Sequence, residues 1–164
     1  MKWLWNALFK WASNRQPDLV IGGKERPYLK RHRLLPSNPL LNIFVHEFLR
    51  SDDDRALHDH PWLFNISVLL SGEYREHTPH GVFARYCGDI VFRWWKSPHR
   101  VELLTIADFV SSQPYNDTPI SCWTLFIRGP RIREWGFYCP QGWVHWRDFG
   151  GRDDRGAVGK GCDQ

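Results

Sequence analysis

Residues 58–72 read His-Asp-His-Pro-Trp-Leu-Phe-Asn-Ile-Ser-Val-Leu-Leu-Ser-Gly, and the two histidines at the start decide how the chain is interpreted. On an extended segment, side chains two residues apart point to the same side, so the imidazoles of His58 and His60 can reach one ion. His99, just after the strand-like stretch 89–94, supplies a candidate third ligand. Three protein ligands that leave coordination positions open describe a metal site that can bind a further molecule.

Length and composition are those of one packed globular domain. The chain has 164 residues, 42% of them hydrophobic, with ten Trp and ten Phe, which predicts an aromatic core. A net charge of +4 arises from 22 basic and 18 acidic residues spread along the chain, and residues 30–33 form the one basic cluster. Because such clusters are usually solvated faces and no nucleic-acid-binding motif accompanies this one, we expect no nucleic-acid partner.

The four cysteines predict no disulfide framework. Cys87, Cys122, Cys139 and Cys162 lie far apart and form no C-x-x-C pair. We therefore expect a reduced, cytoplasmic environment, with Cys122 and Cys139 as small buried residues inside strands. No apolar run approaches the length of a membrane span, and no convincing signal peptide is present, so we expect a soluble protein.

The first segment, residues 1–14, has the pattern of an amphipathic helix. Its expected apolar face is formed by Trp3, Leu4, Ala7, Leu8 and Trp11 and is widened by Trp5 and Phe9, and we expect Trp3, Leu4, Leu8 and Trp11 to pack on protein. Such a helix could lie on a membrane, but covering a sheet of its own domain or of a partner is the commoner use, so we expect packing and leave a homo-oligomer formed through this helix open. Residues 15–38 complete an N-terminal region, 1–38, as a linker or wrapping arm.

From residue 39 to 149 the pattern changes to short strands between turn signals, which predicts a β-sandwich or barrel. A glycine-rich tail, 150–164, is expected to be flexible. The expected strands cover residues 41–49, 64–71, 89–95, 101–104, 123–128, 134–139 and 143–147.

The spacing His58-x-His60-x4-Asn65-x6-Gly72 resembles the first sequence motif of the cupin superfamily, in which a glutamate normally occupies the place of Asn65. Gly88 and His99 loosely match the second motif. The resemblance implies an all-β fold, a small jelly-roll barrel or double-stranded β-helix, with the metal inside its mouth. It implies His58, His60 and His99 as metal ligands.

Asn65 departs from the cupin pattern. On one unbroken strand it would point away from His60, because their separation is odd, so we expect a bend at Pro61 to turn it toward the cavity. A neutral amide leaves the charge of a divalent ion uncompensated, which favours an anionic substrate. A three-histidine set is similar to that of the thiol dioxygenases, which hold Fe(II); Zn, Mn or Ni remain open, because imidazole binds them all.

Further candidates surround this set. Arg131 or Arg133 could bind the anionic end of a substrate, although charged residues often crowd turns as solvated groups. His145 could be a general acid or base, although a lone histidine in an aromatic strand is more often a core residue. Tyr138 could act as the acid of an epimerase. Glu76, on the strand leaving Gly72, could also face the cavity.

Three functions are compatible with these residues. The favoured one is a mononuclear iron-dependent dioxygenase-like enzyme that acts on a small anionic substrate. A cupin-type isomerase or epimerase is the nearest enzymatic alternative. A non-catalytic cupin that binds a metal or ligand, as a sensor or assembly protein, belongs to a different class.

Overall fold

A computed structural model describes residues 2–22, 25–52, 56–112, 114–150 and 161–162. Strands predominate, as the sequence predicts. The elements in chain order are α1 (Lys2–Ser13), β1 (Leu19–Ile21), β2 (Leu29–Arg33), β3 (Asn42–Phe48), β4 (Leu57–His58), β5 (Phe64–Ser71), β6 (Tyr74–Thr78), β7 (Gly81–Arg85), β8 (Ile90–Trp94), β9 (Arg100–Leu103), the 3-10 turn η1 (Ile106–Asp108), β10 (Cys122–Arg128), β11 (Gly136–Cys139), β12 (Gly142–His145) and α2 (Trp146–Gly150).

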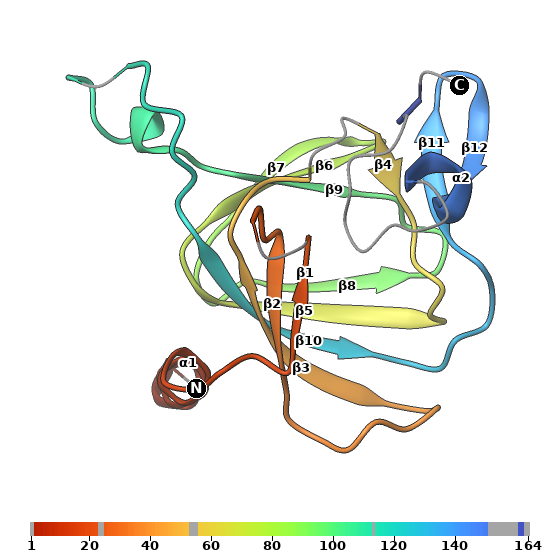
Figure 1. Cartoon of the computed structure of the whole chain (residues 1–164), viewed down its shortest axis with the longest axis horizontal. Coiled ribbons are helices and arrows are strands. Elements are labelled where there is room, and N and C mark those ends of the chain that lie inside the picture. Colours follow the sequence, from red (N-terminus) through yellow and green to blue (C-terminus); the bar gives the residue numbers. More distant parts are fainter. Residues whose placement is uncertain (1, 23–24, 53–55, 113, 151–160, 163–164) are drawn as a thin grey trace.

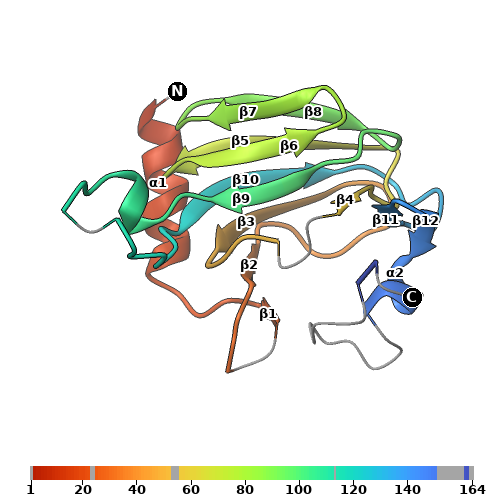
Figure 2. The same ribbon diagram turned by 90° about the horizontal axis from the view of Figure 1, so that it is seen from above.

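The described strands form three antiparallel sheets. The largest has the order β1-β2-β3-β10-β5-β8, a second has the order β7-β6-β9, and a third, β12-β11-β4, lies with α2 at one end of the molecule (Figure 1). The first two sheets enclose the barrel interior, and α1 lies outside the large sheet (Figure 2). This is an antiparallel jelly-roll barrel with an N-terminal helix, the all-β fold class expected from the sequence.

The two faces of the large sheet differ because side chains alternate along each strand. On β10, Leu125 faces outward and belongs to the apolar cluster under α1, whereas Thr124 and Phe126 face inward. One end of the interior is apolar and centres on Leu69 and Leu103. The other end contains buried polar and charged side chains, namely His46, Asn65, Ser67, Glu76, Arg93 and His99.

Helix α1 forms as predicted, but the prediction of which side chains pack on the protein is wrong for most of them. Trp3 is 75% exposed, and Leu4 and Trp11 are also exposed. The sheet is contacted by an i, i+3, i+4, i+7 stripe made of Trp5, Leu8, Phe9 and Ala12, so Leu8 and the two residues expected to widen the face, Trp5 and Phe9, do pack. Apolar residues cover most of the helix circumference, so their periodicity alone could not select the packed side.

All seven predicted strands are present within a few residues. Segment 15–38 carries β1 and β2, which extend the edge of the large sheet next to β3. The hairpin β6–β7 follows Gly72, whose φ of +78° favours glycine, and a Cβ there would lie 2.9 Å from the carbonyl oxygen of Ser121. Most of the tail predicted for residues 150–164 lies outside the described residues.

Two core predictions need correction. A disulfide joins Cys139 to Cys162, contrary to the prediction of no disulfides, because the fold brings together cysteines 23 residues apart that share no motif. Cys122 is buried as a free thiol, as predicted. The expected aromatic core is present only in part, because Trp123 is buried whereas Trp94 and Trp143 are exposed. No helix in the described part of the chain is long and apolar enough to span a bilayer.

Candidate metal centre

Backbone pairing brings two of the three histidines together. His58 ends β4, and His99 lies one residue before β9. The two residues form an isolated antiparallel bridge, in which each backbone N–H donates to the carbonyl of the other at 2.9 and 3.0 Å. Directly opposed residues have Cβ atoms about 4.5–5.5 Å apart, so the imidazoles emerge side by side. His60 continues from β4 on the same side.

The three imidazoles form a nearly equilateral triangle. Ring centroids are separated by 5.1 Å for His58 and His60, 5.0 Å for His58 and His99, and 5.1 Å for His60 and His99. One nitrogen from each ring lies within 4.8 Å of the other two. The structure therefore places the predicted set around one small space.

The separation between the ligand nitrogens of His60 and His99 fits a bound metal ion. Nε2 of His60 lies 2.9 Å from Nε2 of His99. Two nitrogens bound to one ion at about 2.0–2.1 Å lie roughly 2.9–3.4 Å apart, for bond angles from a right angle to the tetrahedral angle. The observed separation falls within that range.

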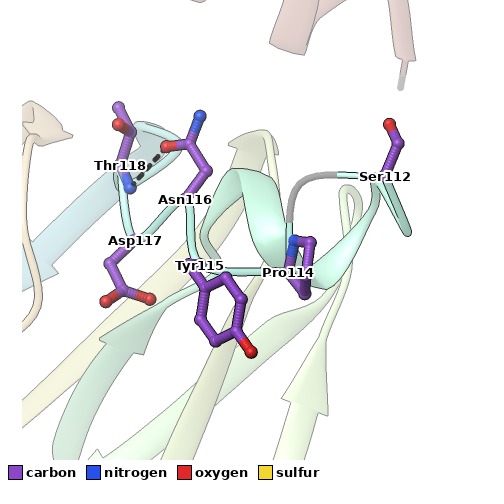
Figure 3. Close-up of a pocket in the computed structure, with 6 residues that line it drawn as sticks. All are labelled: Ser112, Pro114, Tyr115, Asn116, Asp117 and Thr118. Atoms are coloured by element: carbon purple, nitrogen blue, oxygen red, sulfur yellow. Dashed lines mark hydrogen bonds between the residues drawn. The ribbon is translucent and has the colours of Figure 1, made fainter.

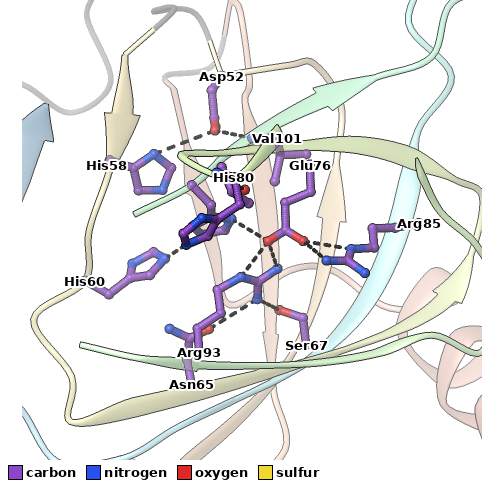
Figure 4. Close-up of polar contacts among 12 residues, drawn as sticks. Asp52, His58, His60, Asn65, Ser67, Glu76, His80, Arg85, Arg93 and Val101 are labelled. Atoms are coloured by element: carbon purple, nitrogen blue, oxygen red, sulfur yellow. Dashed lines mark hydrogen bonds and ion pairs between the residues drawn. The ribbon is translucent and has the colours of Figure 1, made fainter. Parts of the chain in front are cut away.

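Carboxylates lie behind two of the three rings (Figure 4). Nδ1 of His99 is 3.2 Å from Oε1 of Glu76, and Nδ1 of His58 is 3.7 Å from Oδ2 of Asp52. A carboxylate near Nδ1 favours a proton on that nitrogen, which leaves Nε2 as the nitrogen available to a metal. Asp52 is itself held, because the backbone N–H of Val101 donates to its Oδ2 at 2.7 Å.

Glu76 is the centre of a buried charge network. Its Oε1 accepts a hydrogen bond from Nε of Arg93 at 2.7 Å, and its Oε2 accepts one from Nε of Arg85 at 2.7 Å. Nη1 of Arg93 also donates to Oγ of Ser67 at 3.0 Å. Burial opposes ionisation, but the contact with His99 and the charge of Arg93 hold the pKa of Glu76 well below its usual range. Glu76 is therefore an anion that supports His99.

The histidines of the triangle are neutral at physiological pH. Burial, followed by the charge of Arg93, lowers the pKa of His99 from 6.5 to about 3. Burial is also the main cause that lowers the pKa of His58, and it lowers the pKa of His60 further. Neutral imidazole is the form that binds a metal, so these shifts favour coordination.

Aromatic rings form the wall beside His60. Its ring stacks on Trp62 at 5.1 Å with an interplanar angle of 18°, and Trp62 contacts Phe126 edge-on at 5.4 Å. His46, ambiguous in the sequence, is a buried residue stacked between Phe44 and Phe126. These contacts close one side of the centre with apolar surface.

Asn65 lies in the barrel interior, beyond the bend expected at Pro61, but its contact differs from the expectation. Its Oδ1 accepts a 3.4 Å hydrogen bond from Nη1 of Arg93, and among the described residues it forms no hydrogen bond with a histidine of the triangle. Asn65 is completely buried. Asn65 therefore contacts Arg93 of the charge network and is not one of the candidate metal ligands.

Arg133 and Tyr138 converge on Asp59 rather than on the histidines. Asp59 is fully buried and accepts hydrogen bonds from Nη1 of Arg133 at 2.8 Å, the Tyr138 hydroxyl at 3.2 Å and the Trp143 indole at 3.3 Å. Burial, then the charge of Asp59, raises the pKa of Tyr138. The guanidinium of Arg133 thus already has a carboxylate partner, which the sequence did not reveal because the two residues are 74 positions apart.

Arg131 and His145 both contact Glu134 on the outer surface. Arg131 forms an exposed ion pair with Glu134, and Nε2 of His145 lies 3.2 Å from the same carboxylate. Neither residue contacts the histidine triangle. The predicted anion-binding and acid–base residues therefore contact Glu134 or Asp59 and not the histidine triangle.

A surface hollow lies away from the histidines, on the loop after η1 (Figure 3). It encloses about 660 Å³ and is lined by Ser112 and residues 114–118. Tyr115 in its wall is 93% exposed. The lining offers neither a metal-binding cluster nor a buried charge.

No protein-family model matches the chain, and no curated protein matches it. Among solved structures, it is similar to a cupin-2 domain protein from Rhodospirillum rubrum, with 15% identity, a TM-score of 0.49 and coverage of 70% of each chain. It is similar to the DMSP lyase DddQ from Ruegeria pomeroyi, with 16% identity, a TM-score of 0.48 and coverage of 76% of this chain and 60% of that one. KdgF from Halomonas sp. gives 15% identity, a TM-score of 0.47 and coverage of 67% and 87%. These likenesses concern the fold alone.

Proposed function

We propose that this chain is a mononuclear metal-dependent enzyme in which His58, His60 and His99 hold a divalent ion. The observation that carries the proposal is the convergence of three neutral imidazoles whose ligand nitrogens lie within 4.8 Å of one another. Carboxylates at the outer nitrogens of His58 and His99 support it, because such partners commonly orient metal-binding histidines.

Fe(II) is the proposed ion, and the proposed reaction is an oxidation of a small anionic compound by O2. His58, His60 and His99 would hold the ion, and the ion would supply the activation of oxygen. A divalent ion on neutral ligands retains its charge, which favours an anion.

The remaining residues position the ligands and limit access. The carboxylates of Glu76 and Asp52 lie beside Nδ1 of His99 and His58, where their charges favour a proton on Nδ1. Trp62 stacks on His60 and excludes water from one of its faces. The carboxylate of Glu76 is matched by Arg93 and Arg85, so it does not cancel the charge of a bound ion.

Metal analysis of protein purified without added metal or chelator tests the first step. We expect about one Fe per chain, a loss of metal in His99→Ala, and an unchanged content in His80→Ala, which alters an exposed histidine of the hairpin turn. Oxygen consumption with small thiols and organic acids tests the second step. Metal retention in His99→Ala would exclude the site, whereas bound metal without turnover of any substrate would favour a sensor.

A further inference from the structure

Two arginines lie on the interior side of the large sheet, beside the candidate metal centre. Arg31 on β2 pairs in register with His46 on β3, and Nε of Arg31 donates to Nε2 of His46 at 3.0 Å. Arg128 ends β10, two residues after the inward-facing Phe126, so the strand alternation places it on the same face. In the sequence, Arg31 belonged to the basic cluster interpreted as a solvated surface.

Neither arginine has a carboxylate partner among the described residues. Arg31 packs its guanidinium over the ring of Phe44 at 4.7 Å, and Arg128 lies 5.7 Å from the ring of Trp62. Burial, together with the charge of Arg128 and then that of Arg33, lowers the pKa of Arg31 from 12.5 to about 10. Like charges that act on each other in a partly desolvated site favour a bound anion.

A buried hydrogen-bond donor points to the same ligand. Asn65 pairs in register with Arg128, and its Nδ2 is buried without a hydrogen-bond partner in the described part of the chain. Its Oδ1 is turned toward Arg93, so Nδ2 lies on the opposite side of the amide (Figure 4). A buried donor without an acceptor costs about 1–3 kcal/mol, which an oxygen atom of a ligand would offset.

Aromatic contacts connect this basic region to the histidines. Phe44 and Phe126 are direct neighbours across β3 and β10, and Phe126 contacts Trp62. Trp62 in turn stacks on His60. A ligand held by the two guanidiniums would therefore have apolar surface between its anionic end and the metal centre.

We propose that Arg31 and Arg128, with the amide nitrogen of Asn65, bind the carboxylate or phosphate group of a small organic anion whose apolar part lies toward Trp62. The inference rests on the proposed function in treating this anion as the substrate of the metal centre. It assigns anion recognition to these residues in place of Arg131 and Arg133, whose charges are paired with Glu134 and Asp59.

Isothermal titration calorimetry of the intact protein with benzoate, phenyl phosphate and neutral benzamide tests the proposal. We expect benzoate or phenyl phosphate to bind, benzamide to bind at least tenfold more weakly, and Arg128→Gln to weaken anion binding at least tenfold. Arg131→Gln, the matched control on an exposed arginine, should bind like the parent. Arg128→Lys, which keeps the charge, gives a second measurement if the glutamine variant does not fold.

Equal affinity in Arg128→Gln and the parent, equal affinity for benzamide and benzoate, or no anion binding up to millimolar concentration would each overturn the inference. The same titration in His99→Ala separates it from the proposed function. Arg128-dependent binding of benzoate by parent protein in which metal analysis finds no ion would leave the anion site standing and remove the metal enzyme. Metal-dependent turnover with unchanged anion binding in Arg128→Gln would support the metal enzyme and remove the anion site.

Discussion

Oε1 of Glu76 lies 3.2 Å from Nδ1 of His99 and at the same time accepts a 2.7 Å hydrogen bond from Nε of Arg93. One carboxylate oxygen thus connects a candidate metal ligand to a buried cation. Glu76 and Arg93 are 1% and 4% exposed, so water does not screen this contact. Changes at Glu76 should affect metal binding and barrel stability together.

Glu76→Gln should lower metal affinity about 10- to 100-fold, because His99 loses the anion that orients it. It should also reduce the free energy of unfolding by about 3–5 kcal/mol, because Arg93 and Arg85 lose their shared counter-charge. Isothermal titration with a divalent ion and urea unfolding measure the two effects. Glu102→Gln, the same change at a less buried glutamate on β9, is the control, and equal losses in both variants would contradict a special role for Glu76.

Chelation should destabilise the parent protein if the triangle is loaded. A ligand present at 100 times its dissociation constant stabilises the folded state by about 2.7 kcal/mol, and chelation removes this contribution. Thermal unfolding with and without a chelator measures the difference. The melting temperature of His60→Ala should be insensitive to the chelator. A chelator response in that variant would place the ion elsewhere.

The decrease in the free energy of unfolding at acid pH should depend on His46. Burial, then the charge of Arg31, holds the pKa of His46 well below 6.5. The unfolded chain therefore binds a proton near pH 6.5 that the folded chain does not, so stability is present above this pH and decreases as the pH falls below it. His46→Gln keeps an acceptor for Arg31 but cannot titrate.

In His46→Gln, the free energy of unfolding should fall less steeply below pH 6.5, by up to about 1.4 kcal/mol per pH unit. Urea unfolding between pH 5 and 8 gives the slopes. His80→Gln changes an exposed turn histidine and should keep the parental slope. Identical slopes for His46→Gln and the parent would show that His46 does not resist protonation in the folded state.

Truncation of Phe9 should reduce the free energy of unfolding much more than truncation of Trp3. Phe9 packs on the core beneath α1 and contacts Trp123 edge-on at 5.3 Å, whereas Trp3 is mostly exposed. Phe9→Ala should cost about 2–4 kcal/mol of unfolding free energy, and Trp3→Ala less than about 0.5 kcal/mol. A large loss for Trp3→Ala would indicate that the exposed side of α1 is covered in solution, for example by a second copy.

Asn65→Asp should weaken anion binding while the shape of the side chain is preserved. The new carboxylate would stand next to Arg93 and beside Arg128, and would reduce the positive potential offered to a ligand. We expect benzoate affinity to fall at least tenfold, with metal content unchanged because Asn65 does not contact the histidines. Unchanged benzoate affinity would remove Asn65 from the anion site.

Local pattern predicted the barrel well because its strands alternate and its turns have characteristic residues. The His58 and His60 pair could be assigned to one site because their spacing is a local property of extended chain. The choice of α1 face could not be predicted, since Trp3, Phe9 and Trp11 are equally apolar. That choice depends on the surface of β10 beneath the helix.

The supporting residues were harder to predict because their partners are distant in sequence. Arg133 is a plausible anion ligand until the fold places Asp59 against it. The strand alternation that placed Glu76 toward the cavity was a usable signal, but nothing local identified Arg93 or His99 as its partners. Strand alternation over residues 29–33 also places Arg31 on the opposite face from Lys30 and His32, its neighbours in the basic cluster.

The bridge between His58 and His99 has a consequence for how the candidate metal centre forms. The two residues are separated by 41 positions, and their pairing requires the chain between them to form the hairpin β6–β7 and return. Contacts of this kind form slowly, because a long loop must close before they contribute. The triangle is therefore assembled by barrel closure, so the rate at which an unfolded chain captures a coloured ion such as Co²⁺ should report the closure step of folding.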